Sequence, residues 1–219
     1  MYDRRVSREH PQFVNALNGV DLLPEATGDR VRIDPTRGDA RGVEVSLAHQ
    51  LRAGLGWTAT YAFARAIDRI GDVDVSRAVD QRHSITVGST YRPAAGRWLV
   101  SAGWLYASGR PYTPERLIID TTMSLGAGGP ITRQVGSHTV LGPLNSLRLP
   151  SYERLDLRAT RYFDLGQQRL MMYADVFNAL NHVNPRGYLY DVQSSPPQLL
   201  RRVNSQIPVL PTIGVTWEF

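Results

Sequence analysis

Apolar and polar residues alternate with a period of two along much of the chain, a pattern that predicts β-strands. In residues 41–52, Val43, Val45 and Leu47 alternate with residues that are polar or small. Successive side chains of a strand lie on opposite faces of a sheet, so each such segment has one apolar and one polar face. Seven strands are predicted, at residues 41–52, 55–68, 82–92, 97–108, 151–163, 169–180 and 209–219. In the sixth segment the alternation breaks near Phe177, which predicts a β-bulge there.

The polar side of the predicted strands consists mainly of small residues. In residues 55–68, Trp57, Tyr61 and Phe63 share one face, while glycine, alanine and threonine occupy the other. Small, weakly polar residues make a poor core for a soluble sandwich, but they suit the wall of a wide lumen that holds water or a plug. The pattern therefore favours a barrel with an apolar outer surface and a polar interior.

The connections between the predicted strands alternate in length. They are short at 53–54, 93–96 and 165–168, and long at 69–80, 109–149 and 181–208. Short periplasmic turns and longer extracellular loops are typical of bacterial outer-membrane barrels. We therefore predict an all-β fold, an antiparallel transmembrane β-barrel segment of about seven to eight strands. Residues 41–219 form the barrel strands, and residues 1–40 contain the end of a preceding strand and an extracellular loop.

Aromatic residues mark the strand ends beside the short turns. A girdle of aromatic rings at this level is expected at the periplasmic membrane interface, because an amphipathic ring is stabilised at the headgroup boundary. The predicted girdle consists of Trp57, Tyr91, Trp98, Phe163, Trp217 and Phe219. Aromatics that merely fill a core would show no preference for one end.

Composition excludes several classes of protein. The 219 residues contain no cysteine, so thiolate metal sites, thiol nucleophiles and disulfides are excluded. All 25 basic residues are arginine, and the net charge of +5 is spread along the chain without a basic block, so we expect no nucleic-acid partner. A mean hydropathy of -0.28 and the lack of a long apolar run exclude transmembrane helices. The N-terminal MYDRRVSREH has no apolar signal-peptide core, so we expect that an exported chain has lost its beginning.

Enzyme signatures are absent from the sequence. It has no GxSxG, HExxH or GxxxxGK[ST] motif, and its five histidines are isolated from one another. In a barrel, Asp80 and His83 would lie at the outer rim with Asp68 and Asp72, and we interpret them as charges that solvate the loop bases. We predict that the chain is not an enzyme and has no cofactor or metal. A site assembled across strands is the open alternative.

Five stretches together resemble the C-terminal part of a TonB-dependent receptor. They are ARGVEVSLAHQL, DQRH, SGRPYTP, YERLDLRATRYF and ADVFNALNHVNPRGY, and the resemblance runs from about Arg41 to Phe219. It implies the last third of a 22-stranded outer-membrane barrel, with the plug domain absent. Seven is an odd number of strands, which indicates an incomplete barrel, and residues Tyr2–Val6 would end the preceding strand.

The resemblance also implies a function and partners. The function is energy-coupled uptake of a scarce nutrient across the outer membrane, which requires the plug and the remaining strands. The implied partners are outer-membrane lipid, the barrel-assembly machinery, the rest of the receptor and, through the missing N-terminal part only, TonB. The long loops would contact the ligand, and their candidate residues are Arg110, Tyr112, Arg116, Arg133, Tyr188 and Tyr190. Three charges on the lumen side, Arg154, Asp156 and Arg158, would contact a plug or an anionic solute, or form structural ion pairs.

The closing PTIGVTWEF resembles the C-terminal signal by which outer-membrane barrels are recognised by their assembly machinery. Its matching residues are Thr212, Gly214, Trp217 and Phe219. Thr212 and Gly214 would face the lumen, and Trp217 and Phe219 would face lipid.

Two other classes of protein fit the same alternation. One is a small self-contained outer-membrane barrel, either a passive pore or an enzyme with its site at the rim, which requires an eighth strand within residues 1–40. The other is a soluble β-sandwich that binds a partner. It would be favoured if the chain stayed soluble and folded without detergent.

Overall fold

The computed structural model describes residues 1–7, 11–15, 30–52, 54–94, 96–125, 131–193 and 198–219. Every regular element in these ranges is a β-strand. Among the described residues, no helix has the length and apolar character needed to span a membrane.

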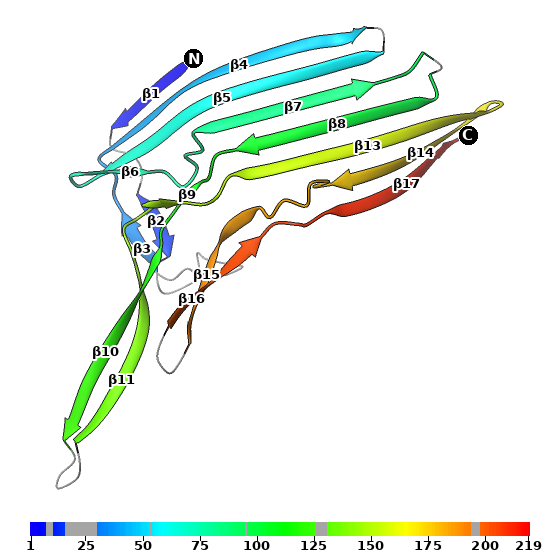
Figure 1. Ribbon diagram of the computed structural model, residues 1–219. Coiled ribbons are helices and arrows are strands. Elements are labelled where there is room, and N and C mark those ends of the chain that lie inside the picture. The colour runs from blue at the N-terminus through cyan, green and yellow to red at the C-terminus, as the bar shows by residue number, and fades with distance from the viewer. Residues whose placement is uncertain (8–10, 16–29, 53, 95, 126–130, 194–197) are drawn as a thin grey trace.

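One antiparallel sheet forms the body of the structure (Figure 1). Its strands are β1 (Tyr2–Ser7), β4 (Arg37–Arg52), β5 (Leu55–Ile70), β7 (His83–Tyr91), β8 (Trp98–Ala107), β13 (Tyr152–Leu165), β14 (Gln168–Phe177) and β17 (Leu210–Glu218). They lie side by side in chain order, and the short β6 (Val73–Ser76) folds back onto β5. Each strand of this series pairs with the next one, as neighbouring strands of a barrel wall do.

The predicted fold class is confirmed. The seven predicted strands are present, and β1 pairs with β4 as the preceding strand, with Tyr2 opposite Gly42 and Ser7 opposite Arg37. The eighth strand that a small self-contained barrel needs is therefore present. However, within the described residues β1 pairs only with β4 and β17 pairs only with β14, so the barrel is not closed in this structure.

The predicted long connections are present, and several of their segments pair with themselves. The resulting hairpins are β2 (Gln12–Asn15) with β3 (Arg30–Ile33), β10 (Glu115–Leu125) with β11 (Ile131–Leu141), and β15 (Pro185–Gln193) with β16 (Gln198–Ser205). At the base of the second hairpin, β9 (Pro111–Tyr112) pairs with β12 (Leu147–Arg148). Backbone groups outside the main sheet still need hydrogen-bond partners, and a hairpin supplies them. Figure 1 shows all these hairpins at one end of the sheet, which we call the hairpin end.

The opposite, short-turn end contains the three tight connections, and each includes a glycine with positive φ. The φ angles are 85° at Gly54, 70° at Gly96 and 70° at Gly166. Tight hairpin turns need this left-handed conformation, which costs glycine little. At Gly54 space is limiting as well, because a Cβ atom would lie 2.2 Å from the carbonyl oxygen of Arg92.

The alternation breaks where β14 ends, at Phe177. The registers of β14 with β13 and with β17 run without a shift up to this residue, and the backbone N–H of Ala179 then donates to the carbonyl oxygen of Leu155 at 2.7 Å, one residue out of register. A shift of this kind agrees with the predicted bulge.

Asn178, the residue after Phe177, has a φ of 50° and is fully buried. Its side chain donates to the carbonyl oxygens of His182 (3.0 Å) and Ile207 (3.3 Å) and accepts from the backbone N–H of His182 (3.1 Å). The alternation breaks because the chain turns here.

The sheet has one apolar and one polar face and is a single layer. Side chains such as Val45, Tyr61 and Val87 form the apolar face, and Ser46, Thr60 and Thr86 lie on the polar face. Of the described apolar residues other than proline and glycine, only Ala107 and Leu149 are buried, whereas Leu47 is 60% and Ile213 is 87% exposed. A β-sandwich would cover such a face with a second sheet. The soluble sandwich is therefore the wrong interpretation of the alternation.

Candidate functional site

The polar face of the sheet is hollowed across several strands from β5 to β17. The hollow has a volume of about 860 Å³. Its polar-face lining consists of small, hydroxyl-bearing and charged residues together with one aromatic ring: Gly56, Thr58, Gly88, Thr90, Ser101, Gly103, Asp156, Arg158, Asp175, Phe177 and Thr212. Small residues keep the wall thin, so the face has room for a polar solute or another polypeptide.

The three charges that the sequence placed on this face all have partners. Arg154 Nε donates to Asp156 Oδ2 at 2.9 Å on the same strand. Arg158 forms a two-point pair with Asp175 of β14, at 2.5 Å and 2.7 Å. Such bidentate pairs fix geometry as well as charge. The row therefore joins β13 to β14, and its role as a contact for a plug or a solute stays a prediction.

A second hollow, of about 530 Å³, lies at the hairpin end. It is lined by the ends of β7, β8 and β13, by the segment after β8 that contains Arg110, and by the start of β15 with Arg186. In the described part of the chain, neither arginine forms an ion pair or a hydrogen bond through its side chain. The hairpin end of the sheet thus presents two positive charges next to a polar hollow.

The residues predicted to contact a ligand all belong to the hairpin end. Arg110 lines the second hollow, Tyr112 lies in β9, and Arg116 begins β10 beside Glu115. The ring of Tyr112 lies 5.2 Å from that of Tyr188 in β15, so two segments far apart in sequence meet here. Arg133 lies in β11 and Tyr190 in β15, but their side chains lie outside the described part of the structure. Ligand binding by this group stays a prediction.

Asp80 anchors the base of the β10–β11 hairpin. Its side chain is 1% exposed and pairs with Arg148 of β12. Arg148 also donates to the carbonyl oxygens of Asp80 (2.6 Å) and Gly109 (3.0 Å), and Asp80 Oδ1 accepts from the backbone N–H of Ala66 at 2.7 Å. The sequence predicted a solvated rim charge. It gave no sign of this burial, because the partner arginine is far away in the chain.

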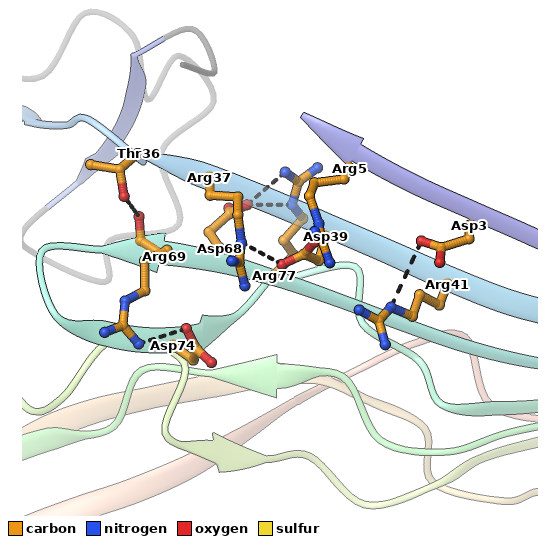
Figure 2. Close-up of polar contacts among 10 residues, drawn as sticks. All are labelled: Asp3, Arg5, Thr36, Arg37, Asp39, Arg41, Asp68, Arg69, Asp74 and Arg77. Carbon is orange, nitrogen blue, oxygen red and sulfur yellow. Dashed lines mark hydrogen bonds and ion pairs between the residues drawn. The ribbon is translucent and has the colours of Figure 1, made fainter. Parts of the chain in front are cut away.

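Figure 2 shows further charged side chains where β1, β4, β5 and β6 meet. Asp39 accepts from Arg5 Nε at 2.8 Å and pairs with Arg37 at 2.7 Å. The hydrogen bond from Arg5 lowers the pKa of the Asp39 carboxyl, although burial opposes the shift. Asp68, buried like Asp39, pairs with Arg77 at 2.6 Å. Both aspartates are therefore partners of arginines that bind the strand ends together.

The six residues of the predicted aromatic girdle lie at the short-turn end. Trp217 Nε1 donates to Gln168 Oε1 at 3.2 Å, and the ring of Trp217 lies 6.5 Å from that of Phe219. The guanidinium of Arg161 lies over the rings of Trp98 (5.2 Å) and Phe163 (4.9 Å). Tyr91 and Trp57 occupy neighbouring positions of β7 and β5 at the same end. The role of the group at a membrane interface stays a prediction.

A second group of aromatics, which the sequence analysis missed, lies toward the hairpin end of the apolar face. Tyr61 and Tyr106 lie on one line across the sheet, with Ile85 between them. The ring of Trp104 stacks on Tyr106 at 6.2 Å, and its Nε1 donates to Glu153 Oε1 at 3.1 Å. The alternation already placed these rings on the apolar face. Their common level depends on the strand registers, which the sequence does not state.

The residues of the predicted assembly signal lie in or next to β17. By strand alternation, Thr212 and Gly214 lie on the polar face and Trp217 lies on the apolar face. The side chain of Phe219, which follows β17, is 99% exposed. Gly214 lies under the ring of Tyr173, where a Cβ atom would be 2.2 Å from the ring. Recognition by an assembly machinery stays a prediction.

Metal-ligating side chains do not gather within the described ranges. No group of three or more histidines, aspartates or glutamates there has the arrangement of a metal site. His83 instead accepts or donates a hydrogen bond with the Tyr61 hydroxyl at 2.9 Å, and His138 pairs with Asp120 at 2.9 Å. His83 and His138 thus each have a side-chain partner.

The single-layer sheet, its exposed apolar face and the hollow on its polar face define a portion of a membrane-embedded β-barrel. Residues 16–179 match the family described as TonB dependent receptor-like, beta-barrel. The match covers most of the chain, and the chain therefore belongs to this family of receptor-type transporters. A search of curated proteins found no match.

Proposed function

We propose that the chain forms part of the wall of an outer-membrane receptor that takes up a scarce nutrient in a step coupled to TonB. The apolar face contacts lipid, and the polar face lines the lumen. The hairpin end faces the outside of the cell and presents the ligand-binding segments. Membership of the receptor family supports the proposal.

The observation that supports it best is the contrast between the two faces of the sheet. The apolar face exposes residues such as Leu47 and Ile213, and the polar face has a hollow of about 860 Å³. Exposed apolar surface of this extent is costly in water and favourable in lipid. The hollow gives room for a plug that contacts the lumen wall. Energy coupling would pass through that plug, which also carries the segment for TonB.

The direct test is localisation combined with uptake. The protein that contains this chain is expressed in a Gram-negative host, and outer-membrane, inner-membrane and soluble fractions are separated. We expect the protein in the outer membrane and a nutrient uptake that disappears when TonB is deleted. Recovery in the soluble or inner-membrane fraction would contradict the membrane assignment, and uptake that persists without TonB would contradict energy coupling.

The β10–β11 hairpin offers a test of ligand recognition. Replacing residues 117–139 with a short glycine–serine turn keeps the hairpin base, where Arg148 pairs with Asp80. We propose that this variant still reaches the outer membrane but binds its ligand more weakly. A variant that transports at the normal rate would exclude the hairpin from recognition.

A second candidate is a small self-contained barrel that acts as a passive pore. The presence of β1 favours it, because eight strands are enough for the smallest outer-membrane barrels. Conductance across a planar bilayer, independent of TonB, distinguishes it from a receptor. In either case we propose that the chain is not an enzyme. The barrel-assembly machinery is a proposed partner through the region around Thr212, Gly214, Trp217 and Phe219.

A further inference from the structure

The apolar face ends toward the hairpins at a pair of arginines. Arg41 of β4 lies directly opposite Arg65 of β5, and both side chains are on the apolar face. The next pair toward the short-turn end is Val43 opposite Phe63, and apolar residues continue from there. We call Arg41 and Arg65 the arginine rung.

Two like charges directly opposite each other destabilise a sheet unless an anion lies between them. Arg41 has one acidic neighbour, Asp3, whose carboxylate lies 3.7 Å away, and both side chains are more than half exposed. An exposed pair of this kind contributes little. Arg65 is exposed and makes no hydrogen bond or ion pair in the described part of the chain. The rung therefore has an excess of positive charge.

The neighbouring arginine pair shows how the protein neutralises like charges elsewhere. Arg37 lies opposite Arg69, four residues farther along each strand from the apolar residues. Arg37 pairs with Asp39 at 2.7 Å, and Arg69 pairs with Asp74 at 3.0 Å (Figure 2). Each arginine of that pair thus has a close carboxylate. In the arginine rung Arg41 has only the more distant Asp3, at 3.7 Å, and Arg65 has no carboxylate partner in the described residues, which points to an anion from outside the chain.

The level of the rung identifies where that anion comes from. From Leu55 to Phe63 the apolar face of β5 spans eight residue steps, about 27 Å along the strand. With the usual strand tilt this is a height of about 20 Å, close to the apolar band of an outer-membrane barrel. Arg65 is the next residue of this face. The arginine rung therefore lies at the level of lipid headgroups.

We infer that the arginine rung binds the phosphate of a lipid headgroup, with the acyl chains of that lipid along Val43, Phe63 and the apolar residues below them. The inference rests on the proposed membrane location. Guanidinium groups match phosphate oxygens in two-point contacts, and phosphate would remove the repulsion between Arg41 and Arg65. A dissolved phosphate would gain nothing from the apolar surface beside the rung. The lipid source is therefore favoured.

The test is a lipid titration of the whole protein that contains this chain, purified in detergent. Dioctanoyl phosphatidic acid is the probe, and the thermal unfolding midpoint, followed by tryptophan fluorescence, reports binding. We expect phosphatidic acid to raise the midpoint and dioctanoylglycerol, which has the same chains without phosphate, to have a much smaller effect. In Arg65→Gln the apparent affinity for phosphatidic acid should fall by about fivefold, and in Arg41→Gln/Arg65→Gln by more.

Arg4→Gln is the matched control. Arg4 lies opposite Ala40, close to the arginine rung in height, but it points to the polar face. The change removes the same charge, so an effect of net charge alone would be equal in Arg4→Gln and Arg65→Gln. We expect the control to bind phosphatidic acid as the wild type does. Arg65→Lys keeps the positive charge but lacks the planar guanidinium group that makes two-point contacts. Its affinity for phosphatidic acid should fall less than that of Arg65→Gln.

Three results would overturn the inference. They are an equal affinity of wild type and Arg65→Gln for phosphatidic acid, an equal loss in Arg4→Gln, and stabilisation of the wild type by inorganic phosphate as strong as that by phosphatidic acid. None of them bears on nutrient uptake, which Arg65→Gln should leave unchanged in cells. Failure of the proposed function appears instead as wild-type protein outside the outer membrane or as uptake without TonB.

Discussion

At the scale of single residues, the buried side chains are mostly polar and lie near the hairpin end. In the described part of the chain they include Asp39, Asp68, Asp80, Asn178 and Asn184. Each has hydrogen-bond or ion-pair partners, and no buried side-chain nitrogen or oxygen described here lacks one. An open wall has little apolar interior, so buried polar contacts, rather than a hydrophobic core, fix the places where strands end.

Asn178→Ala should lower the free energy of unfolding by about 2 kcal/mol, because it leaves the carbonyl oxygens of His182 and Ile207 without their donor. It also places a less tolerant residue at a φ of 50°. Urea titration of the protein in lipid vesicles, followed by tryptophan fluorescence, measures the loss. Asn181→Ala is the control, since Asn181 also has positive φ but is exposed and gives a single side-chain contact, to Val209. Equal losses in both variants would assign the effect to φ alone.

At the scale of elements, two strand pairs are locked by a tyrosine ring that covers a glycine. Tyr2 of β1 covers Gly42 of β4, and Tyr173 of β14 covers Gly214 of β17, each directly across the pair. The ring of Tyr173 is also covered by the Arg158 guanidinium at 4.5 Å. Glycine is needed at these positions for space, and the ring replaces the packing that glycine lacks.

Gly214→Ala should therefore destabilise the β14–β17 pair by about 1–3 kcal/mol, because the new methyl group would lie 2.2 Å from the Tyr173 ring. Gly103→Ala is the matched control on the polar face of β8, where no atom lies within 4 Å of the added Cβ. The same urea titration compares the two variants. In the background Tyr173→Ala the cost of Gly214→Ala should largely disappear. A full cost in that background would exclude the ring as the cause.

At the scale of the whole molecule, the two faces of one sheet take on the roles that a core and a surface have in a soluble protein. The apolar face lies between two aromatic groups, one at the short-turn end and one that includes Tyr61 and Tyr106. The polar face has paired charges such as Arg158 and Asp175 around its hollow. In the proposed receptor wall, lipid on one side and polar contents on the other would account for this division.

A charge should thus be tolerated on one face and costly on the other. Val87→Arg places a guanidinium near the middle of the apolar face and should cost about 2–4 kcal/mol of folding free energy in a bilayer. Thr86→Arg changes the adjacent residue, which lines the hollow of the hairpin end, and should cost much less. Folding titrations in lipid vesicles compare the two. Equal costs would contradict the assignment of the apolar face to lipid.

The sequence by itself determined the strands and their faces, because a strand exposes alternate residues to two different surroundings. Val43, Val45 and Leu47 therefore define an apolar face without any knowledge of their neighbours. The glycines of the short turns could also be recognised from the sequence, because the positive φ that a tight turn needs is a local requirement. The family resemblance rested on stretches of this kind.

The tertiary structure alone decided what depends on contacts between distant segments. The pairing of Asp80 with Arg148, and the hairpin within the long connection of residues 109–149, join segments whose sequences say nothing of each other. The arginine rung exists only because the register of β4 and β5 places Arg41 opposite Arg65. Register is set by many backbone hydrogen bonds together, and a shift of one residue would move these side chains to opposite faces.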